Sequence, residues 1–457
     1  MKLAFEALQA ELGAISVVRP MGRVNSVEGS LVRVAGLSAH ASLGDRLEIR
    51  RRDGEALAGE VLRLESTGVA MLTEGATEGV SLDDPVILLQ PPVIAPTEAW
   101  LGRVIDPLCR PLDEAPLMRG PEERPGRAAP PPAATRRGLG PRLDTGMVAL
   151  NTLLPIVRGQ RMGLFAGSGV GKSSLLAQLA RSMQADMVVL ALIGERGREL
   201  RDFVETVLGP EGMRRAVVVA ATSDAPATIR RRCAQTAMSV AEHFRDEGRS
   251  VLLLADSITR FAEAHREVAL AIGEAPALRG YPASTAPLIT SLCERAGPGA
   301  EGQGDITAVF TVLVAGSDME EPLADIMRGV LDGHVVLDRA IAERGRYPAI
   351  DVLRSVSRSL PGAASEDENA LIRRARQLLG AFEASEAMIR AGLYAEGSDP
   401  LLDQAIRAWP ALDAFLAEPE RHGIAHSFER LRLALRKADS LRDQQQPALR
   451  GGESTRG

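Results

Sequence analysis

Aromatic residues, cysteines and long apolar runs are all scarce in this chain of 457 residues. Only 3% of the residues are Phe, Trp or Tyr, so we expect cores built from aliphatic side chains. Cys109, Cys233 and Cys293 are an odd number without close spacing, which argues against both a disulfide framework and a zinc site. Such cysteine usage suits a reducing cytoplasm. Because the chain has no run of about 18 apolar residues and no signal-peptide layout, we expect neither a membrane span nor secretion.

Lysine is nearly absent as well, since arginine supplies the positive charge everywhere except at Lys2, Lys172 and Lys437. The net charge is −6 and the isoelectric point is near 5.7, which argues against a dedicated nucleic-acid binder. Hydrophobic residues make up 45% of the chain and charged residues 25%, which is ordinary for a globular protein. The length allows about two to four domains.

A glycine-rich loop at residues 166–173 reads Ala-Gly-Ser-Gly-Val-Gly-Lys-Ser. An apolar run over 162–166 predicts a buried strand before the loop, and Ser174 begins a segment typical of a helix. A strand, a glycine loop, Lys-Ser and a helix in this order predict a phosphate-binding loop. The expected nucleotide-binding residues are Ala166, Gly167, Ser168, Gly169, Val170, Gly171, Lys172, Ser173 and Ser174.

The backbone N–H groups of such a loop surround phosphate oxygens, and the helix N-terminus adds partial positive charge. Lys172 would reach the β- and γ-phosphates of ATP, and the Ser173 hydroxyl would bind Mg²⁺. A compact ammonium fits between phosphates where a planar guanidinium would not, which agrees with a lysine being kept here. Ala166 departs from the usual pattern, which begins with glycine. The alternative is a glycine-rich turn that binds no ligand.

Two carboxylates follow later predicted strands. Asp256 ends the apolar run 251–255, where it would hold the Mg²⁺ shell through water, unless it only caps the next helix. Glu195 follows the run 187–193 and is the best candidate to orient the attacking water, with Arg196 beside it to balance phosphate charge. The alternative for Glu195 and Arg196 is a solvated charge cluster at the start of a helix. An arginine finger is also required, and the residues alone leave open which of several arginines supplies it: Arg260, Arg328, Arg339, Arg346 and Arg358.

The chain divides into five segments by pattern. Residues 2–12 carry apolar positions at roughly helical spacing, which predicts a helix within a segment 1–18 that either packs on the body or docks a partner or membrane. About six short alternating segments over 19–92 predict a small antiparallel β-barrel. A Pro-, Gly- and Arg-rich connection at 115–141 leads to alternating strands and helices, within a domain 93–365. Beyond it, 366–443 reads as a helical domain and 444–457 as a disordered tail.

The central domain is predicted to be an open, mostly parallel α/β sheet with ligands at the carboxyl ends of its strands. Its expected strands are continuous apolar runs at 161–166, 187–193, 216–221, 251–255 and 306–314. The expected helices include 227–244 in this domain, and 368–382, 403–417 and 427–443 in the C-terminal domain.

Several motifs point to one family. Residues 348–358 read Pro-Ala-Ile-Asp-Val-Leu-Arg-Ser-Val-Ser-Arg, which resembles the signature of rotary ATP synthase α/β subunits and their relatives. The glycine loop, the element Gly-Glu-Arg at 194–196 and the run Asp-Ser-Ile-Thr-Arg-Phe at 256–261 are similar to the same family in order and spacing. The resemblance covers about residues 20–440. Within the family, three stretches look most like flagellar type III export ATPases: 158–169, 279–282 and 331–334.

The resemblance implies a P-loop NTPase (RecA-like) central domain and assigns roles to single residues. Lys172 and Ser173 would be the phosphate and Mg²⁺ residues, and Glu195 the catalytic carboxylate with Arg196 as its phosphate-contacting neighbour. Asp256 would be the acid that holds the Mg²⁺ shell, and Arg260 would lie near the γ-phosphate. Tyr347 would stack on adenine, and Arg358 would be the arginine finger that reaches into the neighbouring subunit's site. Tyr347 as a plain core residue and Arg358 as a structural ion pair are the alternatives.

The finger implies a ring, so we expect a cytoplasmic, Mg²⁺-dependent ATPase that works as a homohexamer in flagellar protein export. The resemblance further implies several partners: a regulatory stator-like protein at the N-terminal segment, a central stalk protein, an export gate, chaperone–substrate complexes and peripheral contact with the cytoplasmic membrane. No nucleic-acid partner is expected.

Four alternatives stay open. The first is a virulence type III secretion ATPase, which the sequence distinguishes poorly from a flagellar export ATPase. A rotary ATP synthase subunit is disfavoured because residues 393–400 read Leu-Tyr-Ala-Glu-Gly-Ser-Asp-Pro instead of an acidic lever. A nucleic-acid-driven motor would need stacking aromatics in its barrel, and residues 20–90 contain none. A non-catalytic scaffold subunit is disfavoured by the presence of both Lys172 and Glu195.

Overall fold

The computed structural model describes residues 18–113, 115–314 and 319–439. The expected helix over 2–12 and the expected tail from 444 lie outside the described residues. The chain forms two compact units, the first from residues 1–141 and 157–334 and the second from 142–156 and 335–457. None of the described helices combines the length and the apolar character that a membrane span requires.

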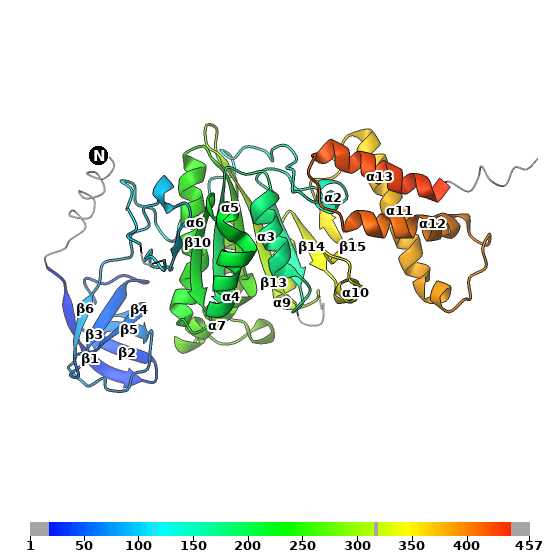
Figure 1. The fold of residues 1–457 in the computed structure, drawn as a ribbon. Coiled ribbons are helices and arrows are strands. Elements are labelled where there is room, and N and C mark those ends of the chain that lie inside the picture. The colour runs from blue at the N-terminus through cyan, green and yellow to red at the C-terminus, as the bar shows by residue number, and fades with distance from the viewer. Residues whose placement is uncertain (1–17, 114, 315–318, 440–457) are drawn as a thin grey trace, which may run out of the picture. The chain divides into compact units, whose positions relative to one another are not determined.

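A closed barrel of six antiparallel strands, in the order β1-β2-β5-β4-β3-β6, begins the first unit and confirms the predicted β-barrel (Figure 1). Its strands are β1 (Met21–Glu28), β2 (Leu31–Ala35), β3 (Arg46–Arg50), β4 (Ala56–Glu65), β5 (Gly68–Thr73) and β6 (Pro85–Leu88). Buried and exposed residues alternate along β2 and β3, as expected for strands with one face in a core. The core itself is aliphatic, and its members include Val24, Val32, Val34, Leu47, Ile49, Val61, Val69 and Val86.

The centre of the first unit is a parallel sheet in the order β8-β13-β11-β9-β10-β7. Its strands are β7 (Val104–Ile105), β8 (Arg161–Ala166), β9 (Met187–Glu195), β10 (Ala216–Thr222), β11 (Ser250–Asp256) and β13 (Asp305–Leu313), and β12 (Gly297–Pro298) pairs antiparallel with β13. All five predicted strands are confirmed, with ends that shift by at most two residues. Strands that are buried on both faces have continuous apolar runs, and every residue of β11, for example, is buried.

Helices surround this sheet (Figure 1). They are η1 (Glu98–Trp100), α3 (Lys172–Ser182), α4 (Gly197–Asp202), the π-helical turn η2 (Phe203–Leu208), α5 (Gly209–Met213), α6 (Ala227–Asp246), α7 (Ile258–Ala271), η3 (Leu278–Gly280), α8 (Thr285–Arg295) and α9 (Pro322–Val330). The long helix α6 packs against β9, β10 and β11, and α7 packs against β9 and β13. Because the strands are parallel, the carboxyl ends of β8, β9 and β11 meet at one edge, and the loops after them are brought together.

The second unit is mainly helical, as predicted. It contains α2 (Val148–Asn151), α10 (Arg339–Glu343), β15 (Ile350–Ser357), α11 (Glu366–Arg390), α12 (Pro400–Leu416) and α13 (Ile424–Asp439), and β14 (Gly333–Leu337) lies where the chain passes from one unit to the other. Ser365 caps α11 with a capping box to Glu368. The predicted end of this helix at 382 was eight residues too early, because the apolar periodicity stops there while good helix formers continue to Arg390.

A buried arginine–glutamate pair joins two helices of the first unit. Arg295 of α8 donates from Nε to Oε1 of Glu242 at 2.8 Å and from Nη2 to Oε2 at 2.6 Å. The remaining guanidinium donors contact the Ser239 hydroxyl at 2.9 Å and the Gly126 carbonyl at 3.0 Å. The charge of Arg295 is therefore fully compensated at a position that is only 3% exposed.

Replacing Glu242 by Gln leaves this buried guanidinium without its counter-ion. We expect the free energy of unfolding of the first unit to fall by about 3–5 kcal/mol, the range found when one partner of a buried ion pair is removed. Urea denaturation followed by circular dichroism measures the loss. Glu247→Gln, just beyond the end of the same helix and exposed, should change stability by no more than about 0.5 kcal/mol. Equal stability of the two variants would contradict the role of the pair.

Candidate active site

The glycine loop connects β8 directly to α3. Gly169 has φ of +77° and Gly171 has φ of +91°, a region of backbone space that glycine adopts without strain. Gly171 is the N-cap of α3 and no side chain caps the helix, so the N–H groups of its first turn face the loop. Ala166 is the last, buried residue of β8. Its backbone is extended strand, where an alanine fits as well as the usual glycine.

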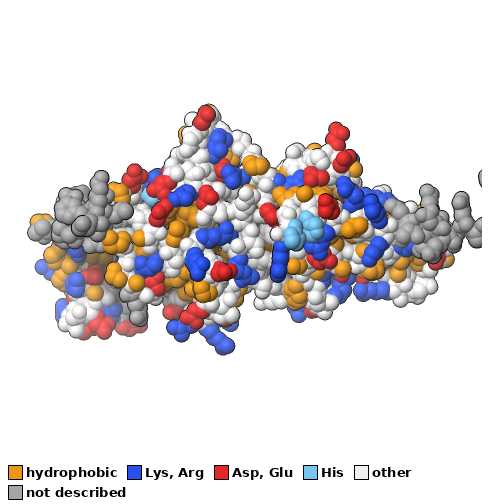
Figure 2. All heavy atoms as spheres, turned by 45° about the horizontal axis from the view of Figure 1, so that its top comes forward, with side chains coloured by type: hydrophobic (Ala, Val, Ile, Leu, Met, Phe, Trp, Pro, Cys, Tyr) orange, Lys and Arg blue, Asp and Glu red, His pale blue; other side chains and the backbone are white. Residues whose placement is uncertain are grey.

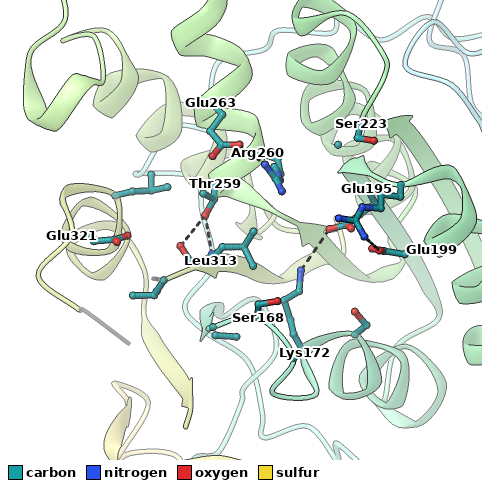
Figure 3. Close-up of a pocket in the computed structure, with 18 of the residues that line it drawn as sticks. Ser168, Lys172, Glu195, Glu199, Ser223, Thr259, Arg260, Glu263, Leu313 and Glu321 are labelled. Carbon is teal, nitrogen blue, oxygen red and sulfur yellow. Dashed lines mark hydrogen bonds and ion pairs between the residues drawn. The ribbon is translucent and has the colours of Figure 1, made fainter. Parts of the chain in front are cut away.

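The side chain of Lys172 lies between two carboxylates, which come from the ends of β9 and β11. Its ammonium donates to Oδ1 of Asp256. It also lies 3.7 Å from Oε1 of Glu195, the contact drawn in Figure 3. The lysine side chain is 11% exposed, so these carboxylates compensate a largely buried charge. Three residues distant in sequence thus meet at the predicted sheet edge.

Asp256 does not cap the helix that follows it. The N-cap of α7 is Ser257, whose hydroxyl accepts the backbone N–H of Arg260 at 3.3 Å. Asp256 instead accepts the hydroxyl of Thr311 on β13 at 2.6 Å, on the same oxygen that accepts Lys172. The helix-cap alternative for Asp256 is therefore wrong.

Glu195 has the electrostatic environment of a group with altered proton affinity. Burial raises the pKa of Glu195, the neighbouring Asp256 carboxylate raises it further, and the Lys172 ammonium opposes both effects. A carboxylate in such surroundings holds a proton at a higher pH than an exposed glutamate does. Raised proton affinity in a cavity is typical of a group that takes part in proton transfer.

Lys172 and Glu195 line a cavity of about 1000 Å³, together with Arg196 and Arg260. Arg196 pairs with Oε1 of Glu199 at 3.3 Å, and Arg260 pairs with Oε2 of Glu263 at 2.9 Å. Figure 3 shows Arg260 and Glu263 on one side of the region above Lys172, and Glu195 and Glu199 on the other. The solvated-cluster alternative for Arg196 agrees with its 80% exposure, although the residue does line the cavity.

The oxygen donors at this edge of the sheet fit Mg²⁺. Ser173, in the first turn of α3, and Asp256 supply a hydroxyl and a carboxylate, which are hard oxygen ligands. In the described part of the chain, no group of three or more His, Cys, Asp or Glu side chains is placed to hold a metal ion. An all-protein cage is not needed, because Mg²⁺ keeps several waters and binds through one or two protein groups plus phosphates.

Thr311, Glu199 and Glu263 are not among the site residues predicted from the sequence. Thr311 is a polar residue within the otherwise apolar strand β13, and this is the signal that could have identified it. Glu199 and Glu263 each lie three residues after an arginine that was identified, a spacing at which side chains on a helix meet.

Two predicted residues belong to the second unit. Tyr347 is 51% exposed, which disagrees with a plain core tyrosine, and Arg358 directly follows β15. Among the other finger candidates in this unit, Arg346 is 7% exposed and its Nε lies 3.1 Å from Oδ1 of Asp413, which indicates a structural residue. Arg339 pairs with Glu343 on the surface of α10.

Comparisons with known proteins identify the family of the chain. Residues 146–357 match the nucleotide-binding domain of the ATP synthase alpha/beta family, and residues 364–435 match the T3SS EscN ATPase C-terminal domain. The flagellum-specific ATP synthase of Caulobacter vibrioides is 46% identical over 421 residues, which span 90% of this chain and 95% of that protein.

Solved structures give the same result. The assembled ATPase EscN from the type III secretion system of enteropathogenic E. coli superposes with a TM-score of 0.83 at 34% identity, covering 91% of this chain and all of that one. EscN in complex with its central stalk EscO gives a TM-score of 0.81 over the same shares. The chain therefore belongs to the ATP synthase alpha/beta family and is an ATPase of the flagellar and type III secretion export type.

Proposed function

We propose that this ATPase works as a homohexameric ring that hydrolyses ATP with Mg²⁺ to energise flagellar protein export. The observation that carries the hydrolytic part is the meeting of Lys172, Glu195 and Asp256 at one edge of the sheet. The flagellar assignment is supported by 46% identity to the Caulobacter flagellum-specific ATP synthase, against 41% to the type 3 secretion system ATPase of Xanthomonas euvesicatoria.

Hydrolysis proceeds by in-line attack of water on the γ-phosphate. The loop N–H groups and Lys172 hold the β- and γ-phosphates, and the ionised Glu195 accepts a hydrogen bond from the attacking water and so orients it. Arg196 and Arg260 lie in the same cavity and balance the charge that develops on the transferred group. Thr311 fixes the Asp256 carboxylate.

The Ser173 hydroxyl and, through water, the Asp256 carboxylate would hold the Mg²⁺ of the bound nucleotide. When bound, Mg²⁺ neutralises charge on the phosphate oxygens.

Arg358 acts as the finger for a neighbouring protomer, and Tyr347 stacks on adenine. Both lie in the second unit, at the end of β15 and just before it. The exposed ring of Tyr347 suits a stacking role. Assembly is supported by the similarity to EscN, which is described in assembled form.

The partners follow from the family. A central stalk protein is supported by the complex of EscN with EscO. The segment 1–18 docks a regulatory stator-like protein, and the ring delivers chaperone–substrate complexes to an export gate from the cytoplasm, in peripheral contact with the membrane. We expect no nucleic-acid partner, because the net charge of −6 disfavours binding to a polyanion. On the face drawn in Figure 2, Lys and Arg side chains lie interspersed with Asp and Glu.

A virulence type III secretion ATPase is the second candidate, favoured by the match of residues 364–435 to the EscN C-terminal domain. A strain without the gene separates the two. Loss of motility and of flagellar export supports the flagellar assignment, whereas intact motility with loss of effector secretion supports the alternative.

Lys172→Ala should reduce steady-state ATP hydrolysis to background, because it removes the ammonium that contacts the transferred phosphate. The same variant should fail to restore export in the gene-deleted strain. Lys437→Ala is the matched control, since Lys437 is the other lysine in the described part of the chain and lies on the surface of α13. Hydrolysis by Lys172→Ala at the level of this control would refute the nucleotide site.

Glu195→Gln should bind nucleotide normally but lose turnover by about 10²-fold or more, the range for a positioned acid–base group. Because burial and Asp256 raise the pKa of Glu195, its base form is lost as the pH falls through a value above that of an ordinary glutamate. In the unaltered enzyme, kcat/KM should therefore decline on the acid side at that raised pKa, and Glu195→Gln should lack the decline. An equal loss of binding and turnover would make Glu195 structural.

Arg358 can be tested by mixing two inactive variants. Lys172→Ala protomers keep the finger but lack a working site, and Arg358→Ala protomers keep the site but lack the finger. Each alone should be nearly inactive, since finger stimulation is on the order of 10³-fold or more. Mixed rings should regain part of the activity at interfaces that join an intact site to an intact finger. A mixture that co-assembles and stays inactive would exclude action in trans.

A further inference from the structure

We propose that Glu263 is a positioning residue for ATP hydrolysis, which holds the guanidinium of Arg260 at the phosphate-binding cavity. The inference rests on the proposed role of Arg260 beside the γ-phosphate. Glu263 does not contact the nucleotide in this scheme and acts through the arginine.

The stem of Arg260 is fixed from two sides. Its backbone lies in the first turn of α7, where the Ser257 hydroxyl accepts its N–H. Its side chain passes across Gly194: a Cβ at that glycine would lie 3.4 Å from Cβ and 3.5 Å from Cγ of Arg260. Because Gly194 directly precedes Glu195, this path directs the arginine toward the catalytic carboxylate (Figure 3).

The far end of Arg260 is held by Glu263. Its Nη1 lies 2.9 Å from Oε2 of Glu263, at a three-residue spacing that places both side chains on one face of the helix. Arg260 is 45% exposed, so packing alone does not restrict the guanidinium, and the charge-assisted hydrogen bond supplies the restriction. Both residues line the cavity of about 1000 Å³.

The other charges near Glu263 leave this pairing in place. Arg266, on the next turn of α7, lies over the ring of Tyr281 at 5.1 Å and is engaged there. Glu267 pairs with Arg230 of α6 at 2.7 Å and does not line the cavity. Two glutamates four residues apart on one helix therefore each hold an arginine, and only Glu263 does so at the active site.

Ordering a flexible arginine in advance lowers the entropy cost of using it, which for one such side chain corresponds to about two- to tenfold in rate. The benefit appears in the transition state, where charge on the transferred group is greatest. We therefore expect the pair to act on kcat more than on KM. A partly exposed pair of this kind contributes little to stability, so its removal should not unfold the protein.

The test uses the full-length enzyme with Glu263→Ala and Glu263→Gln, and Glu267→Ala as the matched control. Glu263→Ala should lower kcat about three- to tenfold with KM for ATP within about twofold. Glu263→Gln should retain more activity, because its amide oxygen still accepts the Nη1 hydrogen. Glu267→Ala should keep the kcat of the unaltered enzyme. Melting temperatures identify any folding defect, and if the alanine variant is destabilised, the glutamine variant carries the comparison.

A double-variant cycle with Arg260→Ala shows whether Glu263 acts through the arginine. The second readout is the ratio of affinities for a non-hydrolysable ATP analogue and ADP, which does not require activity. Glu263→Ala should lower the preference for the analogue in the unaltered background and have no effect in the Arg260→Ala background.

Three results would overturn the inference. In the first, Glu263→Ala keeps the kcat and the affinity ratio of the unaltered enzyme while Arg260→Ala is impaired. This result removes the role of Glu263 but leaves that of Arg260. Additive effects in the double variant show that Glu263 acts elsewhere. Full activity of Arg260→Ala removes the proposed role of Arg260, and the positioning role of Glu263 with it.

Discussion

A largely buried ammonium at the start of α3 constrains the whole site. Lys172 is 11% exposed and lies between Asp256 and Glu195, and a charge in such a position requires counter-charges at short range. These come from two other strands, so β8, β9 and β11 must end at the same level. Parallel pairing of β8 with β13, of β13 with β11 and of β11 with β9 provides this. The strands are buried on both faces, as their continuous apolar runs predict. The chemistry of the site therefore depends on the packing of the sheet beneath it.

Much of this arrangement could be predicted from sequence because it rests on strong local patterns. Continuous apolar runs identified the five strands, and the glycine loop identified the connection between β8 and α3. Parallel topology then implied that Lys172, Glu195 and Asp256 would lie near each other. The aliphatic barrel was likewise visible in the alternation of short segments without aromatic residues.

What could not be predicted depends on contacts between distant or weakly patterned residues. The hydroxyl of Thr311 reaches Asp256 across 55 positions of sequence, and only the register of β11 and β13 places them together. Helix α11 continues past residue 382 without an apolar face, so periodicity ends before the helix does. Ser257 caps α7, and Asp256 does not. Which of these two adjacent residues is the cap depends on the backbone conformation where the strand ends.

The cations of the cavity are controlled in two different ways. Lys172 is held by carboxylates from neighbouring strands, which belong to the rigid sheet, whereas Arg196 and Arg260 are each paired with a glutamate three residues later. Carboxylates at the ends of two strands hold the ammonium of Lys172, and burial restricts it further. A local pair orients a long, exposed guanidinium that burial cannot restrict. In a chain that uses arginine for nearly all of its positive charge, this division agrees with a lysine at the buried position beside the glycine loop. The more exposed arginines of the cavity, Arg196 and Arg260, are instead ordered by glutamate partners.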